Sequence, residues 1–189
     1  IVYLDEKIVP NVVHESICVN GGNHLLNLCN FSRLMIGEFF NYTKLFYLDS
    51  DSIVQHDLIN KLSNLDLNNK LLYAVCADKV GVTSDVSNVL HLKSIINTSY
   101  NWDSLIETNI DGNSHAFMGA PFYTDCSKWT DVYDLVISII KKHNLSKEPL
   151  YKLFTMSLLN IVFYNKMGSI KGVRNNGVQA ISELGSTRK

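Results

Sequence analysis

The amino-acid sequence predicts an α/β fold built around a mostly parallel central sheet flanked by helices. Two continuous apolar runs of strand length, 44–49 and 71–78, are typical of buried parallel strands, and each ends in an aspartate. Segments with helical spacing lie between and after them, so strands alternate with helices. Because ligands of such sheets bind at the carboxyl ends of the strands, we expect Asp49 and Asp78 to face the same site.

The remaining elements follow from hydrophobic spacing. Residues 1–5 and 117–123 are expected to be further strands. The 3.6-residue period predicts helices in five segments: 25–40, 57–62, 90–96, 131–143 and 149–164. Residues 8–24 are expected to be irregular, and the tail from Met167, which contains several glycines, shows little core-forming pattern.

The composition is that of a folded domain without a pronounced charge. The 189 residues are 46% hydrophobic and 19% charged, and 17 basic against 18 acidic residues give a formal net charge of -1. This balance offers no global electrostatic basis for binding nucleic acid. The longest apolar stretches are too short to cross a bilayer, so no membrane span is expected.

The four cysteines do not indicate a metal or disulfide framework. None of them forms a C-x-x-C pair, which argues against zinc-ribbon and thioredoxin-like sites. A disulfide framework is not expected in a chain of this size with so few cysteines. Cys29 and Cys76 lie in apolar runs and are expected to be small core residues.

The most informative polar motif is Asp49-Ser50-Asp51, directly after the first apolar strand. The chain turns at a strand end, so both carboxylates can face one point. Hard oxygen ligands at this spacing suit Mg²⁺ or Mn²⁺, which also bind phosphate oxygens, and two carboxylates held close are costly without a cation between them. The pattern predicts a divalent-metal site at Asp49 and Asp51. The alternative is a solvated loop in which Asp51 or Ser52 caps the next helix.

Three kinds of chemistry use such an aspartate pair. An EF-hand loop needs Gly at its sixth position and Glu at its twelfth, which are Val54 and Asn60 here, so it is rejected. A haloacid-dehalogenase-like phosphatase would use Asp49 as nucleophile, but it needs a downstream lysine and a second acidic pair, for which Asp78-Lys79 is a poor substitute. The third chemistry is sugar transfer, in which the metal faces a nucleotide diphosphate.

A longer motif makes the aspartate pair more specific. A helical segment with Arg33-Leu34 is followed, after a gap of about sixteen residues, by Tyr47-Leu-Asp-Ser-Asp51 and then Ile53-Val54. This stretch closely resembles glycosyltransferase family eight, which includes bacterial lipooligosaccharide galactosyltransferases and glycogenin. The resemblance implies a single Rossmann-like domain of the GT-A nucleotide-diphosphosugar transferase type, a UDP-sugar donor, and Mn²⁺ (or Mg²⁺) bound by Asp49 and Asp51.

The resemblance also implies the residues that contact the donor, namely Arg33, Ser50, Asp78 and Gly119. The similarity covers roughly residues 1–176 and is strongest over 31–58. No catalytic residue is assigned, and the family's stereochemistry would be retention of configuration. Trp129, in a Lys-Trp pair that resembles one in the family, is expected to be a core residue and not a sugar platform.

Several positions depart from the family pattern. Phe117 stands where the family has Asn before Gly119, and Thr155-Met156 replaces an Asp-Gln pair that supplies the polar group beneath the reacting sugar carbon. The C-terminal His-x-x-Gly-x-x-Lys-Pro-Trp segment, which provides a third metal ligand in the family, is not found. His115 and His143 are the alternative candidates for that ligand.

We therefore expect residues 1–189 to form one GT-A-like glycosyltransferase domain, either a fragment without the family's first strands and C-terminal metal-ligand segment or a divergent member. The expected reaction is hexosyl transfer from a UDP-sugar to a hydroxyl of a glycan or protein acceptor. Two alternatives remain. One is a degenerate, non-catalytic module that binds a sugar nucleotide or a protein, and the other is the phosphatase.

Overall fold

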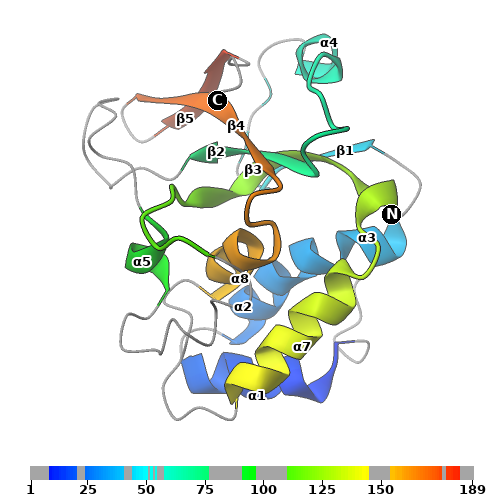
Figure 1. The fold of residues 1–189 in the computed structure, drawn as a ribbon, viewed down its shortest axis with the longest axis vertical. Helices are drawn as coiled ribbons and strands as arrows, with labels where there is room; N and C mark the ends of the chain where they lie inside the picture. Colours follow the sequence, from blue (N-terminus) through cyan, green and yellow to red (C-terminus); the bar gives the residue numbers. More distant parts are fainter. Residues whose placement is uncertain are drawn as a thin grey trace.

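The computed structural model describes residues 9–20, 24–40, 44–50, 52, 54, 58–76, 91–96, 110–144, 154–175 and 178–183. Within these ranges five strands form one sheet in the order β1-β3-β2-β4-β5, and most helices lie together on one side of it (Figure 1). No helix in this part of the chain is long and apolar enough to cross a membrane. The strand predicted at residues 1–5 lies outside the described residues.

The sheet is mixed, so the prediction of a mostly parallel sheet is wrong. β1 (Lys44–Tyr47) and β2 (Leu72–Cys76) both pair antiparallel with β3 (Phe117–Asp125), which lies between them. β4 (Met167–Asn175) pairs parallel with β2, and β5 (Val178–Glu183) pairs antiparallel with β4. A continuous apolar run reports burial on both faces of a strand and carries no information about strand direction, which explains the error.

The strand directions nevertheless bring the predicted site together at one edge. β1, β2 and β4 all run opposite to β3, so the carboxyl ends of β1 and β2 lie at the same edge as the start of β3. In the register, Tyr47 of β1 and Ala74 of β2 both align with Phe122 of β3. Asp49 follows β1 at this edge, whereas Asp78 lies outside the described residues.

The two faces of the sheet bury different clusters, as the two-residue period of a strand requires. Leu72, Ala74 and Phe122 belong to the large core shared with the helices. Tyr73 and Tyr123 face the other way and pack with further apolar residues, among them Leu62, Leu67 and Val75. Leu62 comes from α4 (Leu58–Ser63), which lies on the far side of the sheet from the main helical layer (Figure 1).

The helical layer contains most of the helices that spacing predicted. Its members are α1 (Asn11–Asn20), α2 (His24–Phe31), the 3-10 helix η2 (Ser32–Met35), α3 (Ile36–Phe39), α5 (Leu92–Ile95), α7 (Val132–Asn144) and α8 (Phe154–Val162). The predicted helix at 25–40 is therefore present as α2, η2 and α3 in succession. A second 3-10 helix, η4 (Cys126–Lys128), follows β3 and leads to Trp129.

Two regions without a predicted element form regular structure. Residues 11–20, expected to be irregular, form α1, which buries Val13 against the core. Pro10 precedes the helix, where its missing N–H costs nothing. The tail from Met167 forms β4 and β5, which are paired up to Asn175 and Val178, with Asn176-Gly177 between them in the sequence. Asn-Gly between two strands is a strong hairpin signal, and the two strands form even though the tail contains several glycines.

The prediction that Cys29 is a core residue is also wrong, because its side chain is exposed. On α2 the neighbouring Leu28 and Phe31 occupy the buried stripe. Cys29 is one position after Leu28 and so lies about 100° further round the helix, away from the core. Cys76 belongs to β2, but the environment of its side chain lies outside what the structure describes.

An aromatic group joins the sheet to the helical layer. The fully buried Phe122 stacks on Tyr47 with 4.9 Å between ring centroids, and Trp129 lies 6.3 Å from Phe122 and 4.9 Å from Phe163. The indole N–H of Trp129 donates to Thr124 Oγ1 at 2.7 Å. This confirms the expectation that Trp129 is a core residue, and it fixes Tyr47 at the end of β1 next to the predicted site.

Replacing Phe122 with alanine should test the role of this group. We expect Phe122→Ala to lower the free energy of unfolding by about 3–5 kcal/mol, because a fully buried ring is removed from a packed core. Leu135→Ala on α7, where the side chain is 40% exposed, is the control and should change stability by less than about 0.5 kcal/mol. Urea denaturation measures both, and equal effects would show that Phe122 does not hold the layers together.

Candidate functional site

Arg33 is the residue around which the candidate site is built. It lies in η2 and is only 6% exposed, so it is not an ordinary surface residue of a helix. Its Nη2 donates to Asn30 Oδ1 at 2.6 Å. Asn30 is three residues earlier, one turn back on α2, which is the spacing at which helical side chains meet. The last turn of α2 therefore supplies a group that orients the arginine of η2, which follows it directly in the chain.

The same guanidinium reaches the carboxyl end of β1. Nη2 also donates to Asp49 Oδ1 at 3.2 Å, forming an ion pair between η2 and the residues that follow β1. The arginine end of this pair is buried, whereas the Asp49 side chain is 44% exposed. The pair thus sits at the boundary of the protein, with the cation inside and the carboxylate facing outward.

Tyr47 supports the ion pair from within the sheet. The Arg33 guanidinium carbon lies 5.3 Å from the centroid of the Tyr47 ring, a cation–π contact. Tyr47 is two residues before Asp49, so an extended chain directs both side chains to the same face. Burial raises the pKa of the Tyr47 hydroxyl; the charge of Arg33 opposes this rise and the charge of Asp49 adds to it. The hydroxyl therefore stays protonated at neutral pH.

Gly119 on β3 closes the site from the third side. A Cβ atom built on Gly119 would lie 2.5 Å from Nη1 of Arg33, closer than a side-chain carbon can approach. The same position is 4.0 Å from Cβ of Met156 on α8. The absence of a side chain at residue 119 therefore makes the space that the guanidinium occupies between β3, β1 and α8.

The guanidinium retains unsatisfied hydrogen-bonding capacity. Nε of Arg33 is buried and has no hydrogen-bond partner among the described residues. An arginine carries five N–H donors, and a buried polar group without a partner is costly. A charge that is buried and only partly paired is a property of sites that receive an anion.

The structure brings together only some of the predicted site residues. Arg33, Asp49 and Gly119 are in direct contact, and the exposed Ser50 follows Asp49 in the chain. Asp51 and Asp78 lie outside the described residues, so their predicted roles are untested. Among the described residues, no group of three or more His, Cys, Asp or Glu side chains is placed to hold a metal ion.

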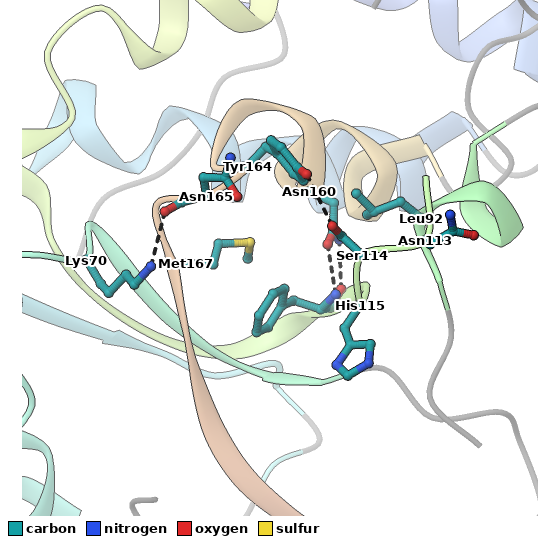
Figure 2. A pocket seen from close by; sticks show the side chains of 10 residues that line it. Lys70, Leu92, Asn113, Ser114, His115, Asn160, Tyr164, Asn165 and Met167 are labelled. Carbon is teal, nitrogen blue, oxygen red and sulfur yellow. Dashed lines mark hydrogen bonds between the residues drawn. The ribbon is translucent and has the colours of Figure 1, made fainter. Parts of the chain in front are cut away.

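Of the two histidines considered as a third metal ligand, only His115 has a side chain that the structure describes. The exposed His115 forms an isolated β-bridge with His91, and their ring centroids lie 5.7 Å apart. His115 also lines a pocket of about 370 Å³, together with Phe117, Asn160 and Tyr164 (Figure 2). Neither Arg33 nor Asp49 is among the described residues that line this pocket. The side chain of His143 lies outside what the structure describes.

Two contributors to the site were missed in the sequence. Tyr47 entered the sequence analysis only as part of the motif that ends in Asp51, although its position two residues before Asp49 indicates a place beneath the site. Asn30 was not singled out, and its only signal is the three-residue spacing to Arg33 on a helix. These two spacings indicate contacts with Arg33 only once the Arg33 side chain is known to point into the protein.

The Thr155-Met156 pair has apolar and hydroxyl groups where the family pattern has Asp-Gln. Thr155 is buried on α8, and Met156 is partly buried and faces Gly119. Because threonine carries a hydroxyl and methionine a thioether, this pair offers neither a carboxylate nor an amide to a ligand beside Arg33. The departure noted in the sequence therefore lies within the site itself.

A family comparison identifies what kind of protein carries this site. The model of glycosyl transferase family 8 matches residues 15–175, which include every described element of the site. The chain belongs to glycosyl transferase family 8. It is therefore a glycosyltransferase enzyme, and the family implies a fold of the GT-A type. No curated protein and no solved structure matches the chain. Membership of the family favours transfer over the phosphatase and non-catalytic alternatives.

Glycosyltransferases of this family generally use a divalent metal, and Asp49 is compatible with one. Its carboxylate is partly exposed at the strand end, where Oδ1 accepts from Arg33 and the side chain also interacts with the Tyr47 hydroxyl. Carboxylate oxygens are the ligands that Mn²⁺ and Mg²⁺ prefer. One described carboxylate can thus serve as a ligand at this edge of the glycosyltransferase.

The close fit between Gly119 and Arg33 predicts that adding a methyl group at residue 119 destabilises the protein only when Arg33 is present. We expect Gly119→Ala to lower the free energy of unfolding by about 1–3 kcal/mol, because Cβ would collide with Nη1. In an Arg33→Ala background the same substitution should cost nothing, since the colliding atom is gone. Urea denaturation of the two single variants and the double variant measures this coupling. An equal cost in both backgrounds would place the strain in the backbone and contradict the contact.

Proposed function

We propose that this glycosyltransferase transfers a hexose from a UDP-sugar to a hydroxyl group of a glycan or protein acceptor. Mn²⁺, or Mg²⁺ in its place, would be held by Asp49 and Asp51 against the donor diphosphate. Arg33, Ser50, Asp78 and Gly119 would contact the donor, all within a single GT-A-like domain over residues 1–189. The buried, partly unpaired guanidinium of Arg33 beside Asp49 is the observation that carries this proposal.

The charge of Arg33 supports a diphosphate as its ligand. Two acceptor groups, from Asn30 and Asp49, share a single nitrogen of the guanidinium, whereas Nε has no partner among the described residues. A phosphate oxygen accepts hydrogen bonds and carries the compensating charge. Binding the donor would therefore complete the pairing of a cation that the fold has already buried, and an already fixed cation needs no reorganisation to stabilise the leaving group.

The metal would add a second positive charge at the same place. When bound, a divalent ion neutralises charge on the departing diphosphate. The ion pair with Arg33 and the contact with Tyr47 would orient the partly exposed carboxylate of Asp49 toward the ion. Asp51, two residues further on, would provide the other carboxylate.

Retention of configuration, the stereochemistry that the family resemblance implies, is part of the proposal. Met156 lies beside Gly119, so an apolar side chain faces the donor site where the family pattern has a polar one. The group beneath the reacting carbon would therefore not come from the Thr155-Met156 pair. We assign no catalytic residue.

Removing both proposed metal ligands tests the function most directly. The double variant Asp49→Asn/Asp51→Asn should lose at least about 100-fold in the Mn²⁺-dependent release of UDP from UDP-hexoses, because charge stabilisation of the leaving group is lost. UDP binding in the presence of Mn²⁺, measured by titration calorimetry, should weaken in parallel. Asp134→Asn on the exposed side of α7 is the matched control and should change neither quantity. Unchanged turnover and UDP binding in the double variant would show that the metal site is wrong.

A further inference from the structure

Asn160 on α8 makes an unusual set of contacts with the start of β3. It is 1% exposed, and its amide makes three hydrogen bonds of 2.8 Å. Nδ2 donates to the carbonyl oxygen of Phe117 and to that of Met156, and Oδ1 accepts from the N–H of Phe117. Figure 2 labels Asn160, and dashed lines mark hydrogen bonds between the residues drawn. The side chain thus pairs with both peptide groups of Phe117 as a neighbouring strand would.

This contact lies next to the part of β3 that has no aligned partner on a neighbouring described strand. Ala74 of β2 aligns with Phe122, but Cys76, only two residues later, aligns with Phe117. Residues 118–121 therefore have no aligned partner among the described strands, since the pairing with β1 begins at Phe122. Gly119 lies within this unpaired stretch. Its position depends on how the two ends of the stretch are held, and Asn160 holds one of them.

The same amide connects both walls of the space that contains Arg33. Phe117 is two residues before Gly119, whose missing Cβ makes room for Nη1. Met156, whose carbonyl accepts the third bond, is one helical turn before Asn160, and its Cβ lies 4.0 Å from the position of a Cβ on Gly119. Asn160 therefore sets the distance between β3 and α8 at the guanidinium.

We propose that Asn160 is a positioning residue of the donor site, which acts on Arg33 through Gly119 and Met156. It would keep the guanidinium in place beside Asp49, where the donor would meet it. The part of this proposal that concerns the donor rests on the proposed function. The part that concerns the placement of Arg33 does not, so the two can fail separately.

Two substitutions of Asn160 test whether its hydrogen bonds position Arg33. Asn160→Asp keeps the shape and the acceptor, but it loses both donated hydrogen bonds and sets a carboxylate against two carbonyl oxygens. Asn160→Leu keeps a similar shape and removes all three bonds without adding a charge. Ser157→Ala is the matched control, because Ser157 is buried on the same helix and donates to the carbonyl of Ile95 at 2.7 Å, on α5 and not on β3.

The arginine content of the chain provides a readout that does not depend on activity. The sequence contains three arginines, Arg33, Arg174 and Arg188, so a ¹⁵N-arginine-labelled sample gives three Nε–H signals, and Arg33→Lys identifies that of Arg33. In the wild type this signal should exchange slowly with water because Nε is buried. In Asn160→Asp we expect its exchange to accelerate at least tenfold, and UDP affinity in the presence of Mn²⁺ to fall by roughly 10–100-fold, as for other partners that orient a binding group.

The outcomes separate a positioning role from a structural one. Ser157→Ala should lower stability but leave the Arg33 signal and the UDP affinity within twofold of the wild type. The proposal is overturned if the Asn160 variants also leave both unchanged, or if Ser157→Ala changes them equally. A third outcome is that exchange of the Arg33 Nε–H accelerates in Asn160→Asp while the wild-type protein binds no UDP. That result would support the positioning role and refute the donor assignment.

Two further measurements keep the proposal testable if Asn160→Asp does not fold. Asn160→Leu gives the same two readouts without burying a charge. In the wild type, the backbone N–H of Phe117 should be protected from hydrogen exchange to the same degree as that of Phe122, because Asn160 Oδ1 accepts from it. Rapid exchange at Phe117 in the folded protein would overturn the proposal without any variant.

Discussion

A buried guanidinium needs partners, because removing its charge from water costs several kcal/mol unless other groups compensate. In this protein the partners of Arg33 come from different parts of the chain. Asn30 lies on α2, Tyr47 at the end of β1 and Asp49 two residues beyond it. Gly119 on β3 provides the space. The position of the ion pair thus determines how the first helices, the end of β1 and the start of β3 must meet, and the proposed donor site lies at that junction.

The compensation is incomplete in a way that suits a transferase. One carboxylate, itself partly exposed, faces the arginine, and a buried N–H has no partner among the described residues. A fold selected only for stability would gain by pairing that donor. The free energy lost by leaving this donor without a partner among the described residues would be regained if a phosphate group bound there. On the proposed function, stability and donor affinity are therefore linked through the same side chain.

Much of the fold could be predicted, because burial and period are local properties of a sequence. The helical segment 25–40 and the strands at 44–49 and 71–78 follow from apolar spacing alone. Strand direction could not be predicted in this way, since β3 runs opposite to its neighbours with an equally apolar sequence. The β4–β5 hairpin was missed because its glycines were read as a lack of pattern, although Gly168 lies against the ring of Tyr73 where no Cβ could fit. The site shows the same division: the motif that joins Arg33 to Asp49 was visible, whereas the roles of Tyr47 and Asn160 depend on contacts between distant segments.

The measurement that tests the central claim most directly is a crystal structure of the protein with UDP and Mn²⁺. If Arg33 and Asp49 form the donor site, density for the diphosphate should lie within hydrogen-bonding distance of the Arg33 guanidinium, with Mn²⁺ bound to Asp49. Density for UDP in the pocket lined by Phe117, Asn160 and Tyr164, with no metal at Asp49, would contradict it.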